Sequence, residues 1–316
     1  MDQILGDLPN CFVYLDNVLI SSPDLKSHLH HVHQVLNLLC LHSLSINPDK
    51  CVFGAAELDY LGIRVSGSGR VSLFKHAEII FAFPCSVDKK SLQHFLGILN
   101  FYSRFLKGAE GLLFPLTETL KGKGQGLSWM NQAFAAAKFI LSDVPTLVHP
   151  DPTARISLSI NAAWSQVGAV LQQEVAGSWA PLAFFSKRLS PAESRYLAFG
   201  RELFADYSAL RNFRFLLKSI QFVLFSDPKL LRQALFKTSP LWSTMQQWHL
   251  SFISEFNCYI RHLPGAENLV ADALSCPGSI NPIPQLVSTV SRPSLPIFHV
   301  IAYTGMSFHQ QSCPKV

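Results

Sequence analysis

The stretch RISLSINAAWSQVGAVLQQEVAGSWAPLAFFSK (155–187) contains three consecutive runs rich in β-branched and aromatic residues. Short polar or Gly-containing segments separate these runs, so they are typical of three strands joined by tight turns. The chain then continues with a long helical pattern over about 191–216, an apolar run at 219–227, further helices over 228–256 and a run at 258–264. A last short helix begins at Asn268. The order βββαβαβα predicts an α/β fold with a five-stranded mixed sheet and flanking helices.

The N-terminal part has different patterns. Residues 11–21 carry two β-rich runs around a central Asp-Asn, which predicts a hairpin. Residues 25–43 place Leu29, Val32 and other apolar residues on one helical face. The turn signal at 66–69 predicts a second hairpin.

The middle of the chain is predominantly helical over 75–142, and residues 91–106 are amphipathic. Eight basic and four acidic residues lie within 70–123, a local excess of four positive charges. Such a segment could follow a phosphate backbone or present an ordinary solvated helix face. The Pro-rich residues 277–316 show no regular period and are expected to form a linker or tail.

The amino-acid composition excludes several classes of protein. The chain has 316 residues, 48% of them hydrophobic and only 15% charged, with a formal net charge of +5. It is too apolar for a disordered protein, and the charge excess is too small to demonstrate a nucleic-acid partner. No apolar run reaches the roughly 18 residues of a membrane span, and the acidic start MDQILGDLPN does not suggest a signal peptide. The seven cysteines form no C-x-x-C pair, so neither a zinc ribbon nor a disulfide framework is expected, and reduced thiols are the simplest interpretation.

Four polar residues stand at the ends or on the faces of the predicted elements around the five-stranded sheet. They are Asn161, Glu202, Asp227 and Asp272. Because strand ends of a mixed sheet lie close together, three carboxylates and one amide can converge there. Clustered oxygen ligands are what paired Mg²⁺ ions require for cleaving a phosphodiester. Each acid taken alone could instead be a surface group or a helix cap, as Asp227 could be for the helix that follows it.

Several sequence blocks in a fixed order resemble one known family, the Pol polyprotein of Ty3/gypsy-type LTR retrotransposons. The blocks are YLDN (14–17), LSINPDKCVFG (44–54), LDYLGIRVS (58–66), LQHFLGILNFYSRFL (92–106), PLTETLKGK (115–123), GAVLQQ (168–173), FFSKRLSPAESRY (184–196), REL (201–203), FSD (225–227) and HLPGAENLVADALS (262–275).

The resemblance implies four regions. Residues 1–69 correspond to part of a reverse-transcriptase palm with a primer-gripping hairpin, and 70–153 to the helical thumb and connection. Residues 154–276 correspond to a ribonuclease H-like domain, and 277–316 remain the linker or tail. The family acts on RNA/DNA hybrids with Mg²⁺, and Mn²⁺ is a possible substitute.

The resemblance also assigns the ribonuclease H carboxylates. Glu202, Asp227 and Asp272 match as metal-binding acids, whereas Asn161 stands where the family has aspartate. An amide donates an oxygen but brings no negative charge to offset repulsion between two cations. We therefore expect impaired ribonuclease H activity.

The polymerase motif is altered as well. The family's Tyr-x-Asp-Asp is here Tyr14-Leu15-Asp16-Asn17, so Asp16 remains as a metal-binding residue and Asn17 is degenerate. The other palm aspartate belongs to a strand upstream of the residues matched here. Polymerisation is expected to be lost.

Other residues have competing interpretations. The pairs His28/His31 and His30/His33 could bind a metal on a helix, although no cysteine partner stands at zinc spacing. Trp129, Trp179, Trp242 and Trp248 could stack on bases. Trp242 and Trp248 fit core packing better, because they share a predicted helix with other apolar residues. The pair Lys187-Arg188 could contact phosphate or simply lie at the surface.

The sequence therefore predicts a retrotransposon-derived reverse transcriptase/ribonuclease H fragment. It would bind RNA/DNA hybrid or another nucleic acid, in the cytoplasm or nucleus, alone or as a dimer with itself or with a complete reverse transcriptase. The alternatives are a non-catalytic nucleic-acid-binding remnant and a pseudogene product.

Overall fold

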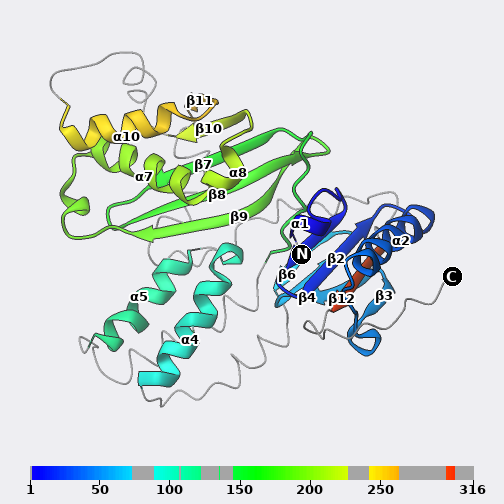
Figure 1. Cartoon of the computed structure of the whole chain (residues 1–316). Helices are drawn as coiled ribbons and strands as arrows, with labels where there is room; N and C mark the ends of the chain where they lie inside the picture. The colour runs from blue at the N-terminus through cyan, green and yellow to red at the C-terminus, as the bar shows by residue number, and fades with distance from the viewer. Residues whose placement is uncertain are drawn as a thin grey trace. The chain divides into compact units, whose positions relative to one another are not determined.

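The computed structural model describes residues 2–72, 89–106, 108–121, 135, 145–226, 242–262 and 297–302 (Figure 1). The chain divides into two compact units. Unit 1 comprises 1–73 and 291–316, and unit 2 comprises 74–290.

A four-stranded sheet forms the centre of unit 1. Its strands are β1 (Cys11–Tyr14), β2 (Asn17–Ser22), β3 (Val52–Ala55) and β12 (Ile297–Ala302), in the order β1-β2-β12-β3. The expected hairpin at 11–21 is β1 and β2, which pair antiparallel from Cys11–Ile20 to Tyr14–Asn17.

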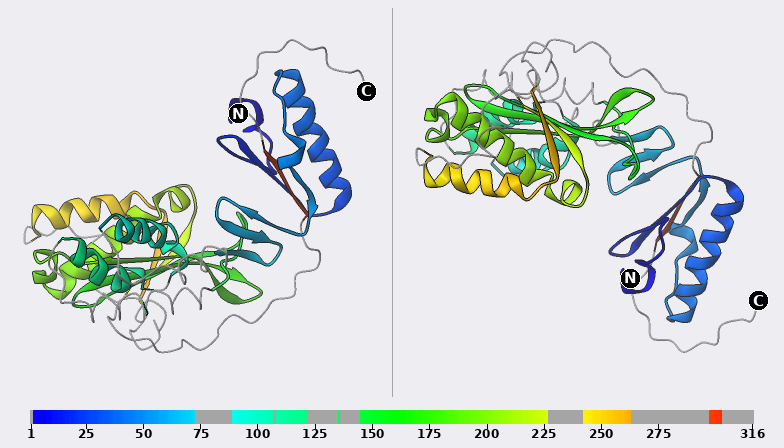
Figure 2. Two further views of the ribbon diagram at one scale, coloured as in Figure 1. Left: turned by 90° about the horizontal axis from the view of Figure 1, so that it is seen from below. Right: turned by 90° about the horizontal axis from the view of Figure 1, so that it is seen from above.

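Strand β12 departs from the sequence-based expectation. Residues 297–302 were expected within a linker or tail, but they form a strand between β2 and β3, antiparallel to both (Figure 2, dark red). Six consecutive residue pairs join β12 to β2. The hairpin β1–β2 is therefore part of a sheet to which a distant segment of the same chain contributes, because an unpaired β2 edge would leave its backbone groups without partners.

Helices α1 (Asp2–Leu5) and α2 (Leu25–Leu41) and the 3₁₀ turn η1 (Pro48–Lys50) complete this part of unit 1. The Asp24 side chain accepts a hydrogen bond from the backbone N–H of Ser27 and so caps α2. The buried face of α2 contains Val32, Val35 and Leu39, as its period predicts, but Leu29 is 53% exposed and His28 is fully buried instead.

A three-stranded antiparallel sheet follows, made of β4 (Glu57–Tyr60), β5 (Ile63–Ser66) and β6 (Gly69–Ser72). The predicted turn at 66–69 joins β5 to β6, and Ser66 pairs with Gly69. A further tight turn at Leu61-Gly62 joins β4 to β5, and both of its residues have positive φ. The sheet packs on β2 through Leu19, Leu58 and Val65.

The first described residues of unit 2 form the helices of the predicted thumb. They are α4 (Lys89–Phe101), the 3₁₀ turn η2 (Ser103–Phe105) and α5 (Ala109–Leu120). The two α-helices share a separate small core of apolar side chains: Leu92, Phe95, Leu96, Leu99, Leu106, Ala109, Leu113 and Leu116.

The rest of unit 2 contains the predicted five-stranded mixed sheet. Its strands are β7 (Ile156–Ala162), β8 (Gln166–Val175), β9 (Ser178–Arg188), β10 (Phe222–Ser226) and β11 (Cys258–His262), in the order β11-β10-β7-β8-β9. Strands β7, β8 and β9 form an antiparallel meander, and β10 lies parallel to both β7 and β11. This confirms the predicted α/β fold.

Among the described residues, helices α7 (Ala198–Asn212), α8 (Arg214–Leu217) and α10 (Thr244–Ser254) accompany this sheet. Helix α10 lies alongside α7 (Figures 1 and 2). The helix expected over 191–216 begins at Ala198, after the 3₁₀ turn η3 (Glu193–Arg195). Reciprocal hydrogen bonds between Ser190 and Glu193 hold η3, and Leu197 is extended, with φ −59° and ψ 159°.

Two further expectations concern cysteines and membranes. Cys11, Cys51 and Cys258 are free thiols, but Cys40 is disulfide-bonded, so the expectation of reduced thiols is wrong at that residue.

Among the residues that the structure describes, no helix combines the length and apolar character needed to cross a bilayer.

Candidate active site

Asn161 lies near the end of strand β7. It pairs with Gly168 of β8 and is half-buried. The residues before it in β7 alternate across the sheet, and Leu158 and Ile160 enter the core of unit 2. The period-two pattern of the strand thus fixes where Asn161 stands.

Glu202 lies in the second turn of α7, the helix that packs against β7. Its neighbour Leu203 is fully buried, and Tyr207 is 6% exposed and packs against rings of α10. Glu202 itself is half-buried. The strand that carries Asn161 and the helix that carries Glu202 are therefore direct neighbours.

One turn further along α7, Asp206 is completely buried. Its Oδ2 accepts a hydrogen bond of 3.3 Å from the Ser226 hydroxyl at the end of β10, and its Oδ1 has no partner among the described residues. Burial raises the pKa of Asp206 well above its usual value; the Ser226 hydrogen bond lowers it, and the nearby charge of Glu202 raises it further.

Asp206 was not anticipated from the sequence. An acid among Leu203, Phe204 and Tyr207, in an apolar stripe, is the signal that could have identified it. Its contact with Ser226 shows that α7 also reaches the end of β10. The other two predicted ligands, Asp227 and Asp272, lie outside the residues that the structure describes.

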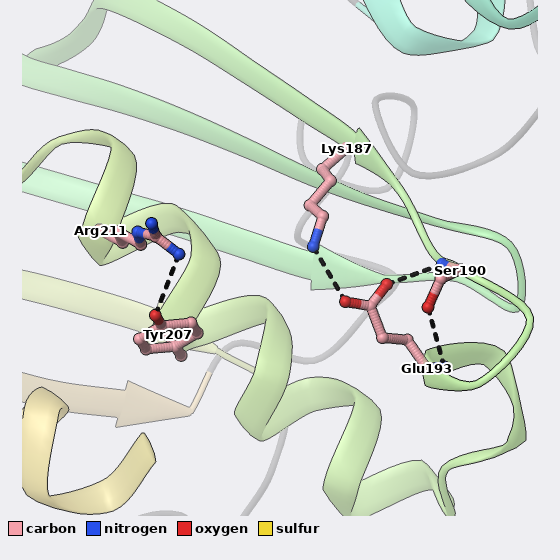
Figure 3. A network of polar contacts seen from close by, with 5 residues as sticks. All are labelled: Lys187, Ser190, Glu193, Tyr207 and Arg211. Atoms are coloured by element: carbon pink, nitrogen blue, oxygen red, sulfur yellow. Dashed lines mark hydrogen bonds and ion pairs between the residues drawn. The ribbon is translucent and has the colours of Figure 1, made fainter. Parts of the chain in front are cut away.

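The basic pair Lys187-Arg188 at the end of β9 has partners within unit 2. Lys187 forms a 3.1 Å ion pair with Glu193 (Figure 3). Its Nζ also lies 4.1 Å from the ring centroid of Phe204. Arg188 lies 3.4 Å from the ring centroid of Phe114 in α5. Burial by itself raises the pKa of Glu193, but hydrogen bonds from Ser190 and Lys187 lower it below its ordinary value. Both basic residues thus support the local structure.

In unit 1, the polymerase motif lies at the β1–β2 turn. Asp16 is exposed in the turn, next to Leu15 with φ +50°, and Asn17 begins β2. The Tyr60 hydroxyl donates to the backbone carbonyl oxygens of Phe12 and Asn17, each at 3.4 Å, and so fastens the hairpin to β4. Burial raises the pKa of Tyr60 to about 12, with smaller effects from Cys11 and Tyr14.

The histidines of α2 form hydrogen bonds with a serine. His28 Nδ1 and His31 Nδ1 lie 2.9 Å and 2.8 Å from the Ser22 hydroxyl, and His31 Nε2 lies 3.2 Å from Asn10 Nδ2. Burial lowers the pKa of His28. Among the described residues no group of three or more His, Cys, Asp or Glu is placed to hold a metal ion.

The tryptophans differ in their environment. Trp242 packs against the core, and Trp248 is 54% exposed with its ring centroid 5.0 Å from that of Tyr207. Trp129 lies outside the described residues. Trp164, which lies in no sequence motif, is 74% exposed in the turn after β7.

Two family models match the chain and define its class. "Reverse transcriptase (RNA-dependent DNA polymerase)" matches residues 1–65, and "RNase H-like domain found in reverse transcriptase" matches 129–224. The chain therefore combines reverse-transcriptase and ribonuclease H-like sequence.

Two retrotransposon polyproteins show to which group of reverse transcriptases this chain is related. The chain is 30% identical over 284 residues to "Transposon Tf2-7 polyprotein" of Schizosaccharomyces pombe. It is 32% identical over 281 residues to "Retrovirus-related Pol polyprotein from transposon 297" of Drosophila melanogaster. The alignments cover 87% of this chain but only 21% and 26% of those proteins. The chain is thus a relative of Ty3/gypsy-type retrotransposon Pol polyproteins, and the predicted resemblance is confirmed.

Solved structures agree on the fold. The foamy viral protease-reverse transcriptase in complex with dsDNA, in its "dRH" form, has a TM-score of 0.75 at 17% identity, over 83% of this chain and 47% of that one. The same viral protein in complex with RNA/DNA hybrid has a TM-score of 0.70 at 18% identity, over 93% of this chain and 39% of that one.

Proposed function

We propose that the chain is a nucleic-acid-binding fragment of a retrotransposon reverse transcriptase with an impaired ribonuclease H site. The site would consist of Glu202, Asp227 and Asp272, with Asn161 in place of the fourth acid. One observation carries this proposal. Asn161 stands at the end of β7, beside the helix of Glu202, so an amide occupies the position where the resemblance requires a carboxylate.

The ligand atoms of this site are oxygens, which divalent cations prefer, but the site lacks one of the negative charges that two cations need. Glu202, Asp227 and Asp272 supply the hard oxygen ligands that Mg²⁺ and Mn²⁺ prefer, and Asn161 supplies at most a neutral oxygen. A bound pair of such ions activates water and stabilises the leaving oxygen of a phosphodiester. Without the fourth negative charge, the remaining residues hold two cations less tightly.

Polymerase activity is not part of this proposal. Asp16 could bind a metal ion, but Asn17 replaces the second acid of the motif. The foamy viral neighbours are described in complex with dsDNA and with RNA/DNA hybrid, which supports hybrid as the ligand of this chain. We place this binding in the cytoplasm or nucleus, with the chain alone, as a homodimer, or paired with a complete reverse transcriptase.

A hybrid-cleavage assay in Mg²⁺ and in Mn²⁺ tests the impaired site. The unmodified chain and Asn161→Asp are compared, with Asn161→Asp/Glu202→Gln as the matched control. Since altering groups that only support a metal ligand costs about 10- to 100-fold, restoring a ligand carboxylate should raise cleavage about 100-fold or more. The control should lose this gain. Equal cleavage by the unmodified chain and Asn161→Asp would refute the assigned role of Asn161.

Filter binding of hybrid at two salt concentrations separates a binding protein from a pseudogene product. Binding through phosphate contacts weakens linearly on a log–log plot as salt rises. No measurable hybrid binding at the lower salt concentration would favour the pseudogene alternative.

A further inference from the structure

Trp164 occupies an unusual position for a large aromatic residue. It lies in the turn between β7 and β8, three residues after Asn161, and is 74% exposed. The turn is closed by a 2.9 Å hydrogen bond from the Ala163 N–H to the Gln166 carbonyl oxygen. The indole is therefore presented to solvent from a short, hydrogen-bonded turn.

Arg201 orders this exposed indole. Its Cζ lies 4.2 Å from the ring centroid of Trp164, so the guanidinium covers one face of the ring. The high exposure of Trp164 leaves the opposite face open. Arg201 immediately precedes Glu202 in α7, which places this pair at the edge of the candidate ribonuclease H site.

The charge of Arg201 is available to a ligand. Its Nε is buried without a hydrogen-bond partner among the described residues, and no ion pair of Arg201 occurs in the same part of the chain. Lys187 and Arg188, by contrast, are held by Glu193 and Phe114. An aromatic face backed by a cation suits a nucleotide, whose base stacks on the ring and whose phosphate meets the charge.

We propose that Trp164 and Arg201 form a stacking platform for an unpaired nucleobase beside the candidate ribonuclease H site. The inference rests on the proposed function in taking unit 2 to bind nucleic acid, and it adds the kind of strand bound. A base within a duplex has both faces covered by its neighbours. The open face of Trp164 therefore suits an unpaired base in a single strand, such as one that extends from a hybrid.

The test measures binding of the full chain to labelled oligonucleotides by fluorescence anisotropy. The probes are a blunt RNA/DNA hybrid, the same hybrid with a short single-stranded RNA or DNA extension, and the extension strand alone. Stacking of one base on an aromatic side chain changes affinity by about 5- to 150-fold. The unmodified chain should prefer at least one extended hybrid to the blunt hybrid by a factor in this range.

Trp164→Ala should abolish that preference and leave affinity for the blunt hybrid within twofold, and Trp164→Phe should retain most of it. Trp248→Ala is the matched control, because Trp248 is also exposed but packs on Tyr207. It should keep the preference. Arg201→Gln should reduce the slope of log affinity against log salt by about 0.7 to 0.9, the value for one lost phosphate contact.

Three results would contradict the stacking platform, the proposed function or both, and each result shows which one fails. Hybrid binding with no preference for extensions, or with a preference that survives Trp164→Ala, would overturn the platform alone. Trp164-dependent binding of the single strand without any binding of hybrid would support the platform and refute the proposed function. Binding of none of the probes would overturn both.

Discussion

Replacing Asp206 with asparagine is expected to stabilise unit 2 at neutral pH. The Asp206 carboxyl is completely buried, and within the described part of the chain only its Oδ2 has a hydrogen-bond partner, the Ser226 hydroxyl. Burial therefore raises the pKa of Asp206, with the Ser226 hydrogen bond opposing and the Glu202 charge adding to the effect. Asparagine has nearly the same shape and no proton to lose.

The sign of the pH effect follows from proton binding. Between the unfolded pKa of an aspartate and the raised pKa of Asp206, the folded protein holds a proton that the unfolded chain has released. The free energy of unfolding of the unmodified protein should therefore fall by about 1.4 kcal/mol per pH unit in this window. Asp206→Asn removes this slope, so its advantage should grow with pH at that rate.

Urea unfolding followed by tryptophan fluorescence measures the effect. The five tryptophans, at 129, 164, 179, 242 and 248, all belong to unit 2. Unfolding curves should be recorded at closely spaced values between about pH 4 and pH 7. Ser208→Ala, which alters a buried hydroxyl of the same helix that does not titrate, is the control and should give a constant difference. A constant difference for Asp206→Asn as well would refute the reasoning.

Three further outcomes are expected. Ser243→Ala removes the side chain that caps α10 in a reciprocal pair with Gln246 and should lower the stability of unit 2 by about 1 kcal/mol in the same urea assay. Ser22→Ala removes the hydroxyl beside buried His28 and should destabilise α2 by about 1–3 kcal/mol, measured by amide hydrogen exchange; unchanged exchange would contradict this. Deleting residues 291–316 removes β12, so backbone amides of β2 that are protected in the full chain should exchange faster.

The five-stranded sheet could be predicted because its signals are local. Each strand has its own apolar pattern and each turn its own polar or Gly residues, so the order of elements alone limits the fold. The same holds for the hairpin β1–β2 and the turn at 66–69.

The differences arise where distant or buried polar contacts decide the structure. Leu29 fits the apolar period of α2, but His28 is buried instead because Ser22 on a neighbouring strand supplies a hydrogen bond. Helix α7 starts at Ala198 and not at about 191, as its apolar pattern predicts, because hydrogen bonds between Ser190 and Glu193 stabilise a 3₁₀ turn before it. Neither contact can be deduced from periodicity.

The candidate site was only partly accessible from the sequence. Asn161 and Glu202 were identified because they stand at two positions of the family's ribonuclease H carboxylates, and the structure places the strand of one beside the helix of the other. Asp206 and Trp164 lie in no motif, and Arg201 lies in the REL block (201–203) but has no role assigned to it there. Their significance comes from burial, exposure and a ring contact, which require coordinates.

Strand β12 has a consequence for the order in which the protein folds during synthesis. Its pairs with β2, from Ile297–Ser22 to Ala302–Asn17, join residues 275 to 285 positions apart. At about 5–20 residues per second, the ribosome would need roughly 15–60 s after making β2 to deliver its partner strand. All of unit 2 is translated during this delay. The edge of β2 therefore stays unpaired until β12 has been made, and its pairing with β12 is a slow, non-local step. A chaperone or a competing strand could bind this edge first.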